Sequence, residues 1–291
     1  MTTAAISRPP IMTTKDSTPK QTESIWILDF GSQFTQLIAR RVRELGVFSR
    51  VVPCTMPYAD IDWSTARGII LSGGPASADA PGAPDCDPRI LKSGVPILGI
   101  CYGLQLWGKL HGGRLARSTT REYGRARFSR SGDNPLFRNV PESFDVWMSH
   151  GDVLATLPSG MSNTGQTDSV SIAALADPDH RFWGLQFHPE VEHTQHGREI
   201  LRAFVFDICH CTGGWDAGVF VEQAIAEVRK QVRDGRVLLG VSGGVDSAVL
   251  ASLLQRAIGD RSVPVFVDTG LLRDDEVNEV HSDSTSSTSG R

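Results

Sequence analysis

The stretch VPILGICYGLQLWGKLHGG (residues 95–113) decides how the chain folds, because it joins a strand to a helix through one sharp turn. The apolar run 95–100 predicts a buried strand, and the pattern after it predicts a helix that ends at a pair of glycines. Cys101 stands at the turn, with a glycine two residues away on each side. A side chain at such an elbow projects above the sheet, and the adjoining helix N-terminus favours a thiolate. Cys101 is therefore a candidate nucleophile, and the alternative is an ordinary buried core cysteine.

A possible base and its orienting acid follow later, in GLQFHPEVEHT (184–194). His188 and Glu190 stand two residues apart at the end of an apolar strand, so their side chains can leave the chain on the same face. A neutral imidazole can take the proton of a thiol and return it to a leaving group. A carboxylate on its other nitrogen fixes the tautomer. The alternative is a surface His–Glu pair.

Consecutive glycines in SGGP (72–75) follow another apolar strand. Without side chains, their N–H groups can approach a ligand closely. With the N–H of Tyr102 they can form an oxyanion hole for a tetrahedral intermediate. The alternative is an ordinary glycine turn.

The rest of residues 25–212 indicates an α/β fold. IWILD (25–29) and RGIILSGGP (67–75) contain strand patterns, and residues 33–45 between them show helical periodicity. Strands that alternate with helices predict parallel neighbours. FDVWMS (144–149) and RFWGLQF (181–187) lack an intervening helix, so a mixed sheet is expected.

Three motifs, LSGGP (71–75), GICYGLQ (99–105) and QFHPE (186–190), resemble in order and separation those of the class I glutamine amidotransferases. The resemblance implies a flavodoxin-like mixed sheet with helices on both faces. It also implies a catalytic triad, oxyanion donors and glutamine contacts. The implied triad is Cys101, His188 and Glu190, and the implied oxyanion donors are Gly74 and Tyr102. The implied glutamine contacts are Gln105, Ser149 and His150.

A second motif lies in RVLLGVSGGVDSAVLASLLQRAIG (236–259), where a strand, a glycine-containing loop and an amphipathic helix favour phosphate binding. The loop lacks the ending of a Walker motif. It resembles instead the SGG-x-DS loop of ATP pyrophosphatases, which implies a Rossmann-like domain that uses ATP and Mg²⁺. Alternatively, Asp246 and Ser247 only cap the helix. The implied ATP contacts are Ser242, Gly243, Gly244, Val245, Asp246, Ser247 and Ala248.

A class I glutaminase directly ahead of such a loop resembles the glutamine-hydrolysing GMP synthase family. That resemblance implies small-molecule substrates: glutamine, ATP and XMP. ATP would adenylylate XMP, and ammonia formed at Cys101 would displace AMP to give GMP. Thr269 stands where the family usually has Asn. Two other functions stay open. One is a catalytically silent remnant or regulatory glutamine-binding domain. The other is a free-standing cysteine hydrolase such as a γ-glutamyl hydrolase, which the SGGVDS segment disfavours.

The expected organisation has five parts: a disordered tail (1–24), the amidotransferase domain (25–212), a hinge (213–218), a partial ATP pyrophosphatase domain (219–280) and a polar tail unlike the family (281–291). We expect a truncated or frame-disrupted product that retains the glutaminase half and lacks the family's dimerisation region.

Composition narrows the possible partners. The 291 residues carry a net charge of −4 and show no dense Lys/Arg block, so no nucleic-acid surface is expected. The apolar runs are far shorter than the roughly 20 residues that span a bilayer, so no membrane insertion is expected. Five irregularly spaced cysteines predict reduced thiols and a cytoplasmic setting. Cys209, His210 and Cys211 lack further ligands at zinc-site spacing, so no metal is expected.

Overall fold

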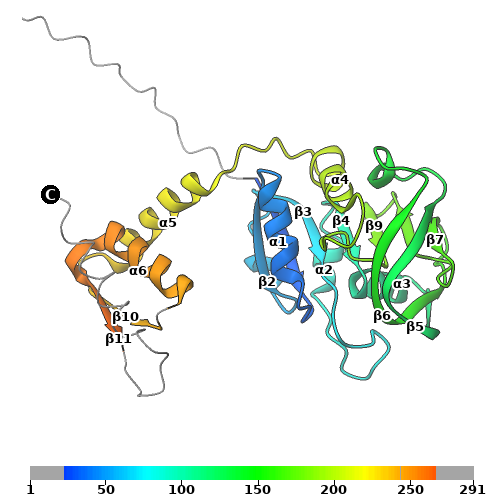
Figure 1. The fold of residues 1–291 in the computed structure, drawn as a ribbon, viewed down its shortest axis with the longest axis horizontal. Coiled ribbons are helices and arrows are strands. Elements are labelled where there is room, and N and C mark those ends of the chain that lie inside the picture. Colours follow the sequence, from blue (N-terminus) through cyan, green and yellow to red (C-terminus); the bar gives the residue numbers. More distant parts are fainter. Residues whose placement is uncertain (1–22, 243, 267–291) are drawn as a thin grey trace, which may run out of the picture. The chain divides into compact units, whose positions relative to one another are not determined.

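The computed structural model describes residues 23–242 and 244–266, and the chain divides into two compact units between Trp215 and Asp216 (Figure 1). Within the described residues, the first unit contains a nine-stranded sheet and the second a two-stranded sheet with helices. The division falls inside segment 213–218, where the sequence predicts a hinge. The predicted tail at 281–291 lies outside the described residues.

The elements of the first unit follow in chain order. They are β1 (Ser24–Asp29), α1 (Thr35–Glu44), β2 (Phe48–Pro53), η1 (Tyr58–Asp60), β3 (Ala66–Leu71), α2 (Pro88–Leu91), β4 (Ile97–Ile100), α3 (Tyr102–Leu110), β5 (Arg114–Arg130), η2 (Pro135–Phe137), β6 (Ser143–Thr156), β7 (Ser162–Thr167), β8 (Ala174–Asp177), β9 (Phe182–Leu185), α4 (Gly197–Arg202) and the π-helical η3 (Ala203–Ile208).

The large sheet has the strand order β2-β1-β3-β4-β9-β8-β7-β5-β6. The first five strands in this order run parallel to one another, and each later pairing is antiparallel. Parallel neighbours need crossover connections, and helices supply them between β1 and β2 and between β3 and β4. Tight turns suffice for antiparallel pairs. The predicted mixed α/β sheet is confirmed.

Both faces of this sheet are covered, and β1 shows how. Ile25 and Ile27 point into one hydrophobic core, which α1, α4 and η3 close. Trp26 and Leu28 point into a second core, which α2 and α3 close. The alternation follows from the two-residue period of a strand, and it explains why β1 is apolar at every position from 25 to 28.

Two predicted boundaries shift in the structure. The expected tail reaches residue 24, but Ser24 is buried and its N–H donates to the carbonyl of Thr65, so strand β1 begins there. Helix α1 begins at Thr35 rather than at residue 33. The Ser32 hydroxyl accepts the N–H of Phe34 at 3.1 Å and forms a turn before the helix.

The second unit consists of α5 (Ala217–Val232), β10 (Val237–Val241), α6 (Val245–Ile258), η4 (Gly259–Arg261) and β11 (Ser262–Phe266). Strands β10 and β11 are parallel, and α5 packs against α6 around a small core. Leu238 of β10 is 75% exposed, so one side of this small sheet is uncovered within the described residues. In those same ranges, no helix is both long and apolar enough to cross a membrane.

Candidate active site

Cys101 occupies the elbow between β4 and α3, and its backbone is strained. Its φ of 51° and ψ of −100° fall where residues with a side chain are rarely found. The Cys101 N–H donates to the carbonyl of Leu185 at 2.7 Å, and the N–H of Gly103 donates to that of Ser72 at 3.2 Å. A Cβ on Gly103 would lie 2.5 Å from the Leu71 carbonyl oxygen, so only glycine lets α3 begin this close to β3.

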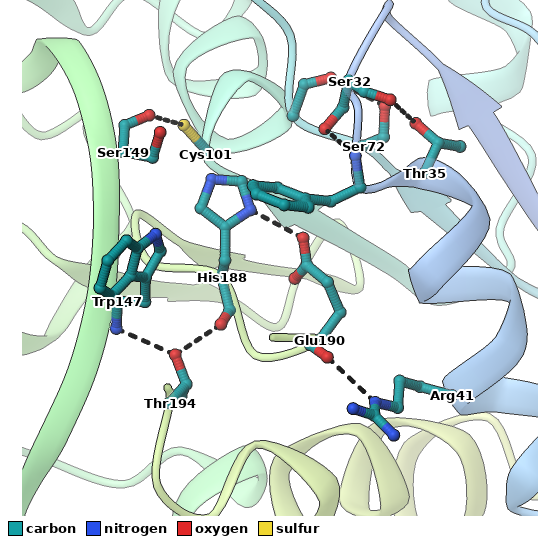
Figure 2. A network of polar contacts seen from close by, with 12 residues as sticks. Ser32, Thr35, Arg41, Ser72, Cys101, Trp147, Ser149, His188, Glu190 and Thr194 are labelled. Atoms are coloured by element: carbon teal, nitrogen blue, oxygen red, sulfur yellow. Dashed lines mark hydrogen bonds and ion pairs between the residues drawn. The ribbon is translucent and has the colours of Figure 1, made fainter. Parts of the chain in front are cut away.

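The His188 imidazole lies between Cys101 and the Glu190 carboxylate (Figure 2). Its Nδ1 is 2.7 Å from Glu190 Oε1, and both side chains are almost fully buried. Burial by itself lowers the pKa of His188, but the Glu190 carboxylate and Cys101 outweigh burial and raise it to about 10. The imidazole therefore holds a proton at neutral pH, next to the sulfur.

Three hydrogen bonds fix the turn that carries His188 and Glu190. The Thr194 hydroxyl donates to the His188 carbonyl at 2.6 Å and accepts the N–H of Trp147 at 2.9 Å. Arg41 of α1 donates through Nε to the Glu190 carbonyl at 3.0 Å. Strand β6 and helix α1 thus help to hold the turn that carries His188 and Glu190 (Figure 2).

The sulfur of Cys101 has two further polar neighbours. The Ser149 carbonyl oxygen lies 3.7 Å from Sγ, and the amide nitrogen of Gln186 lies 3.5 Å from it. The other end of that amide, Gln186 Oε1, accepts from Gln105 Nε2 at 3.3 Å. Gln105 Nε2 also donates to the Asp152 carbonyl at 2.7 Å. Gln105 is predicted to contact glutamine, and here its amide nitrogen is already engaged by the protein.

The two predicted oxyanion donors lie close together. A Cβ on Gly74 would be 2.8 Å from the Phe30 carbonyl oxygen and 3.3 Å from Tyr102 Cγ, so the chain passes tightly between them. Tyr102 is the first residue of α3, and an N–H at that position has no acceptor within its own helix. The Tyr102 ring is buried against Phe30.

An open cleft of about 700 Å³ lies above these groups. Its walls also contain two charged residues that the motifs did not indicate, Arg117 and Asp152. Burial and the positive charge of His188 lower the pKa of His150 to about 4, so His150 is neutral at physiological pH. The predicted residues that line the cleft are Gly74, Cys101, Gln105, Ser149, His150 and His188.

Sequence reasoning assigned no role to Gln186, Thr194 or Arg41. Gln186 lies in a bend directly after β9, two residues before His188, so the alternation of a strand does not mark its position. Thr194 and Arg41 act through partners distant in sequence, and no local pattern marks them.

The predicted ATP loop leads into α6, which begins at Val245 with Asp246 in its first turn. The Ser247 hydroxyl accepts the N–H of Ser242 at 3.3 Å and donates to the Gly244 carbonyl at 2.8 Å. Ser247 thereby links both sides of the loop to the first turn of α6. Gly243 and Thr269 lie outside the described residues.

The other four cysteines are also free. Burial raises the pKa of Cys86 and of Cys211 to about 12 and that of Cys209 well above its ordinary value. Burial also raises the pKa of Cys54. In the described part of the chain, no group of three or more His, Cys, Asp or Glu side chains could hold a metal ion.

Comparison with known proteins gives two family matches. The model of "Glutamine amidotransferase class-I" matches residues 26–208, and that of "NAD synthase" matches 219–277. A glutamine-hydrolysing GMP synthase of Syntrophomonas wolfei is 46% identical over 258 residues, which cover 89% of this chain and 51% of the relative. One from Thermomicrobium roseum is 50% identical over 271 residues, which cover 93% of this chain and 51% of the relative. The chain thus spans about half the length of the curated relatives it matches.

A solved structure shares the architecture of the first unit. It is a Thermoplasma acidophilum protein described as part of a GMP synthase, with a TM-score of 0.58 and 30% sequence identity. The match covers 66% of this chain and 96% of that one.

We predict that a small alkylating agent modifies Cys101 selectively at pH 7. A protonated imidazole next to the sulfur favours the reactive thiolate, whereas burial raises the pKa of the other four thiols. Limited iodoacetamide treatment followed by peptide mass spectrometry should show Cys101 reacting at least about tenfold faster than any other cysteine. In urea, all five should react alike. Equal rates in the folded chain would contradict the assigned geometry.

We also predict a pH-dependent contribution of His188 to stability. Its pKa is about 10 in the fold against 6.5 for an ordinary histidine. Protonated His188 therefore stabilises the fold fully below pH 6.5, and this contribution is lost as pH rises to about 10. The comparison uses Cys101→Ser with and without His188→Gln, because serine removes the titrating thiol while Glu190 remains. The difference in unfolding free energy should shrink steadily as the pH rises above 6.5, because Glu190 alone still raises the pKa of His188.

Urea unfolding followed by tryptophan fluorescence measures this difference cleanly. All six tryptophans lie at or before residue 215, so the signal reports on the first unit alone. A difference that is constant or grows with pH would show that His188 is not protonated in the fold.

Proposed function

The chain belongs to the class I glutamine amidotransferase family, and from that membership we propose that it hydrolyses glutamine at Cys101 to glutamate and ammonia. One observation carries the proposal. A cysteine held in a strained elbow faces a buried imidazole, which is itself bound to a buried carboxylate, beside an open cleft. This combination supplies a nucleophile, a proton carrier and an orienting acid at one place.

The chemistry divides into two steps. In the first, Cys101 Sγ attacks the side-chain amide carbon of glutamine, and protonated His188 gives its proton to the departing nitrogen. The C–N bond breaks, ammonia leaves and a γ-glutamyl thioester remains. In the second, His188 takes a proton from water, the hydroxide attacks the thioester carbon, and the C–S bond breaks to give glutamate and the thiolate.

Preorganised donors stabilise the oxyanion of both tetrahedral intermediates in this proposal. Gly74 and Tyr102 are the candidates, because they lie together beside Cys101. Gln105, Ser149 and His150 are proposed to contact the glutamine, since all three line the cleft. His150 is neutral, so it can donate and accept hydrogen bonds without repelling the positive charge of His188.

We further propose that the ammonia serves GMP synthesis. Support comes from the relatives of 46% and 50% identity, which carry that name, and from the loop before α6. ATP would transfer its adenylyl group to XMP and release pyrophosphate, and ammonia would then displace AMP. Residues 242–248 would hold the phosphates of ATP, with Mg²⁺ balancing their charge. Five free thiols support a reducing, cytoplasmic setting.

The glutaminase proposal is tested by ammonia release from glutamine by the full 291-residue chain. Cys101→Ala should abolish release, and Glu190→Gln should lower kcat at least about tenfold with little change in KM, because the imidazolium loses its partner. Glu192→Gln is the matched control: this side chain is 87% exposed, and the same change there should leave turnover unaltered. A folded chain with no Cys101-dependent turnover would favour the silent regulatory domain.

The nucleotide proposal is tested by binding of labelled ATP with Mg²⁺ in equilibrium dialysis. Gly244→Asp should weaken binding at least about tenfold, because a carboxylate at the helix start repels phosphate. Space exists for the side chain, since a Cβ there would lie 3.5 Å from the Ser242 hydroxyl oxygen. Arg236→Asp, at the other end of β10, should have a much smaller effect. Equal weakening by both variants would place the nucleotide elsewhere.

A further inference from the structure

We propose that Gln186 is a catalytic residue, whose side-chain amide donates a hydrogen bond to the sulfur of Cys101 and stabilises it as a thiolate. Its Nε2 lies 3.5 Å from Sγ, within the range of an N–H···S contact, and both residues are buried. Gln186 follows the end of β9 directly, in a bend, and His188 stands two residues later. One short segment therefore presents two donors to one sulfur.

The orientation of the amide is set by its second contact. Gln186 Oε1 accepts from Gln105 Nε2, and that nitrogen is held by the Asp152 carbonyl. Reversing the amide would place two N–H groups against each other and turn an oxygen toward the sulfur. Gln105 is thus a positioning residue for Gln186, and the Nε2 of Gln186 is committed to Cys101.

The two polar neighbours of the sulfur serve different protonation states. A thiol can donate its S–H to the Ser149 carbonyl, 3.7 Å away. Once the proton has moved to His188, that carbonyl offers the thiolate only a repulsive dipole, whereas the Gln186 amide offers a donor. Because the site is buried, the hydrogen bond is stronger than it would be in water. The Ser149 contact therefore favours the thiol, and the Gln186 contact favours the thiolate that forms once the proton has moved.

This donor acts twice in a turnover, an extension that rests on the proposed glutaminase function. It stabilises the thiolate before attack on glutamine. It acts again when the thioester C–S bond breaks and the sulfur regains its negative charge. In both steps the amide keeps its protons, so the transfer between Cys101 and His188 stays balanced.

The test measures alkylation of Cys101 by iodoacetamide between pH 4.5 and 9.5, with no glutamine present. Gln186→Met removes the donor at similar side-chain length, and the acidic limb of the rate profile should move up by about one pH unit. A hydrogen bond to a charged group accounts for a change of about tenfold or more. The plateau at high pH should stay within about threefold of the parent, because a more basic thiolate is only modestly more nucleophilic.

A second variant tests the proposal if Gln186→Met folds poorly, and a third serves as a control. Gln186→Glu keeps the acceptor toward Gln105 and places a negative charge at the sulfur. The acidic limb of the alkylation profile should therefore move to a still higher pH than in Gln186→Met. Gln166→Met, an exposed position on β7, is the matched control and should leave the profile unchanged. Tryptophan fluorescence confirms folding in each case.

Profiles of Gln186→Met and Gln186→Glu that coincide with the parent would overturn the proposal and leave Gln186 as a space-filling residue. An equal loss across all pH values would do the same, because it indicates a displaced cysteine. The outcome is separate from that of the glutaminase assay. A shifted limb in a chain that releases no ammonia would support the role of Gln186 while refuting the proposed function.

Discussion

The backbone of Cys101 is held at a φ of 51° by two hydrogen bonds: its own N–H donates to Leu185 of β9, and that of Gly103 donates to Ser72, the residue after β3. Such strain costs on the order of 1–3 kcal/mol, and it persists only where surrounding structure over-determines it. Here β3 and β9 do so from both sides of β4. The turn brings the sulfur to the end of the sheet where His188 and Ser149 of β6 also lie.

Burial of the His188–Glu190 pair makes the arrangement fragile as well as effective. Glu190 Oε2 is buried and has no hydrogen-bond partner in the described part of the chain, so His188 is the main support of that carboxylate. Removing one member of a buried pair leaves the other uncompensated, which is more costly than losing an exposed ion pair. The contacts of Thr194 and Arg41 to the carbonyls of this turn help to keep the pair together.

Local patterns predicted the parts of this molecule that depend on nearby residues. The elbow at Cys101 was visible as an apolar strand running into a helix between glycines, and the mixed sheet followed from the order of strand and helix patterns. The roles of Thr194 and Gln186 depend on contacts across the sheet, with Trp147 and Cys101, and sequence spacing carries no record of such distances. Helix α1 begins two residues after the start of its helical periodicity, because the Ser32 hydroxyl holds the N–H of Phe34 in a turn.

The position of β9 has a consequence for how the protein matures. This strand is the last to be made in the first unit, yet it lies between β4 and β8 in the middle of the sheet. Gln186 and Cys101 are 85 residues apart, and contacts of such long range form late, because the loop entropy must be overcome first. A nascent chain that ends before β9 lacks His188, and the two halves of its sheet are not yet joined. The cysteine therefore stays an ordinary thiol until folding is nearly complete, and partly made chains expose no activated sulfur to oxidants or electrophiles.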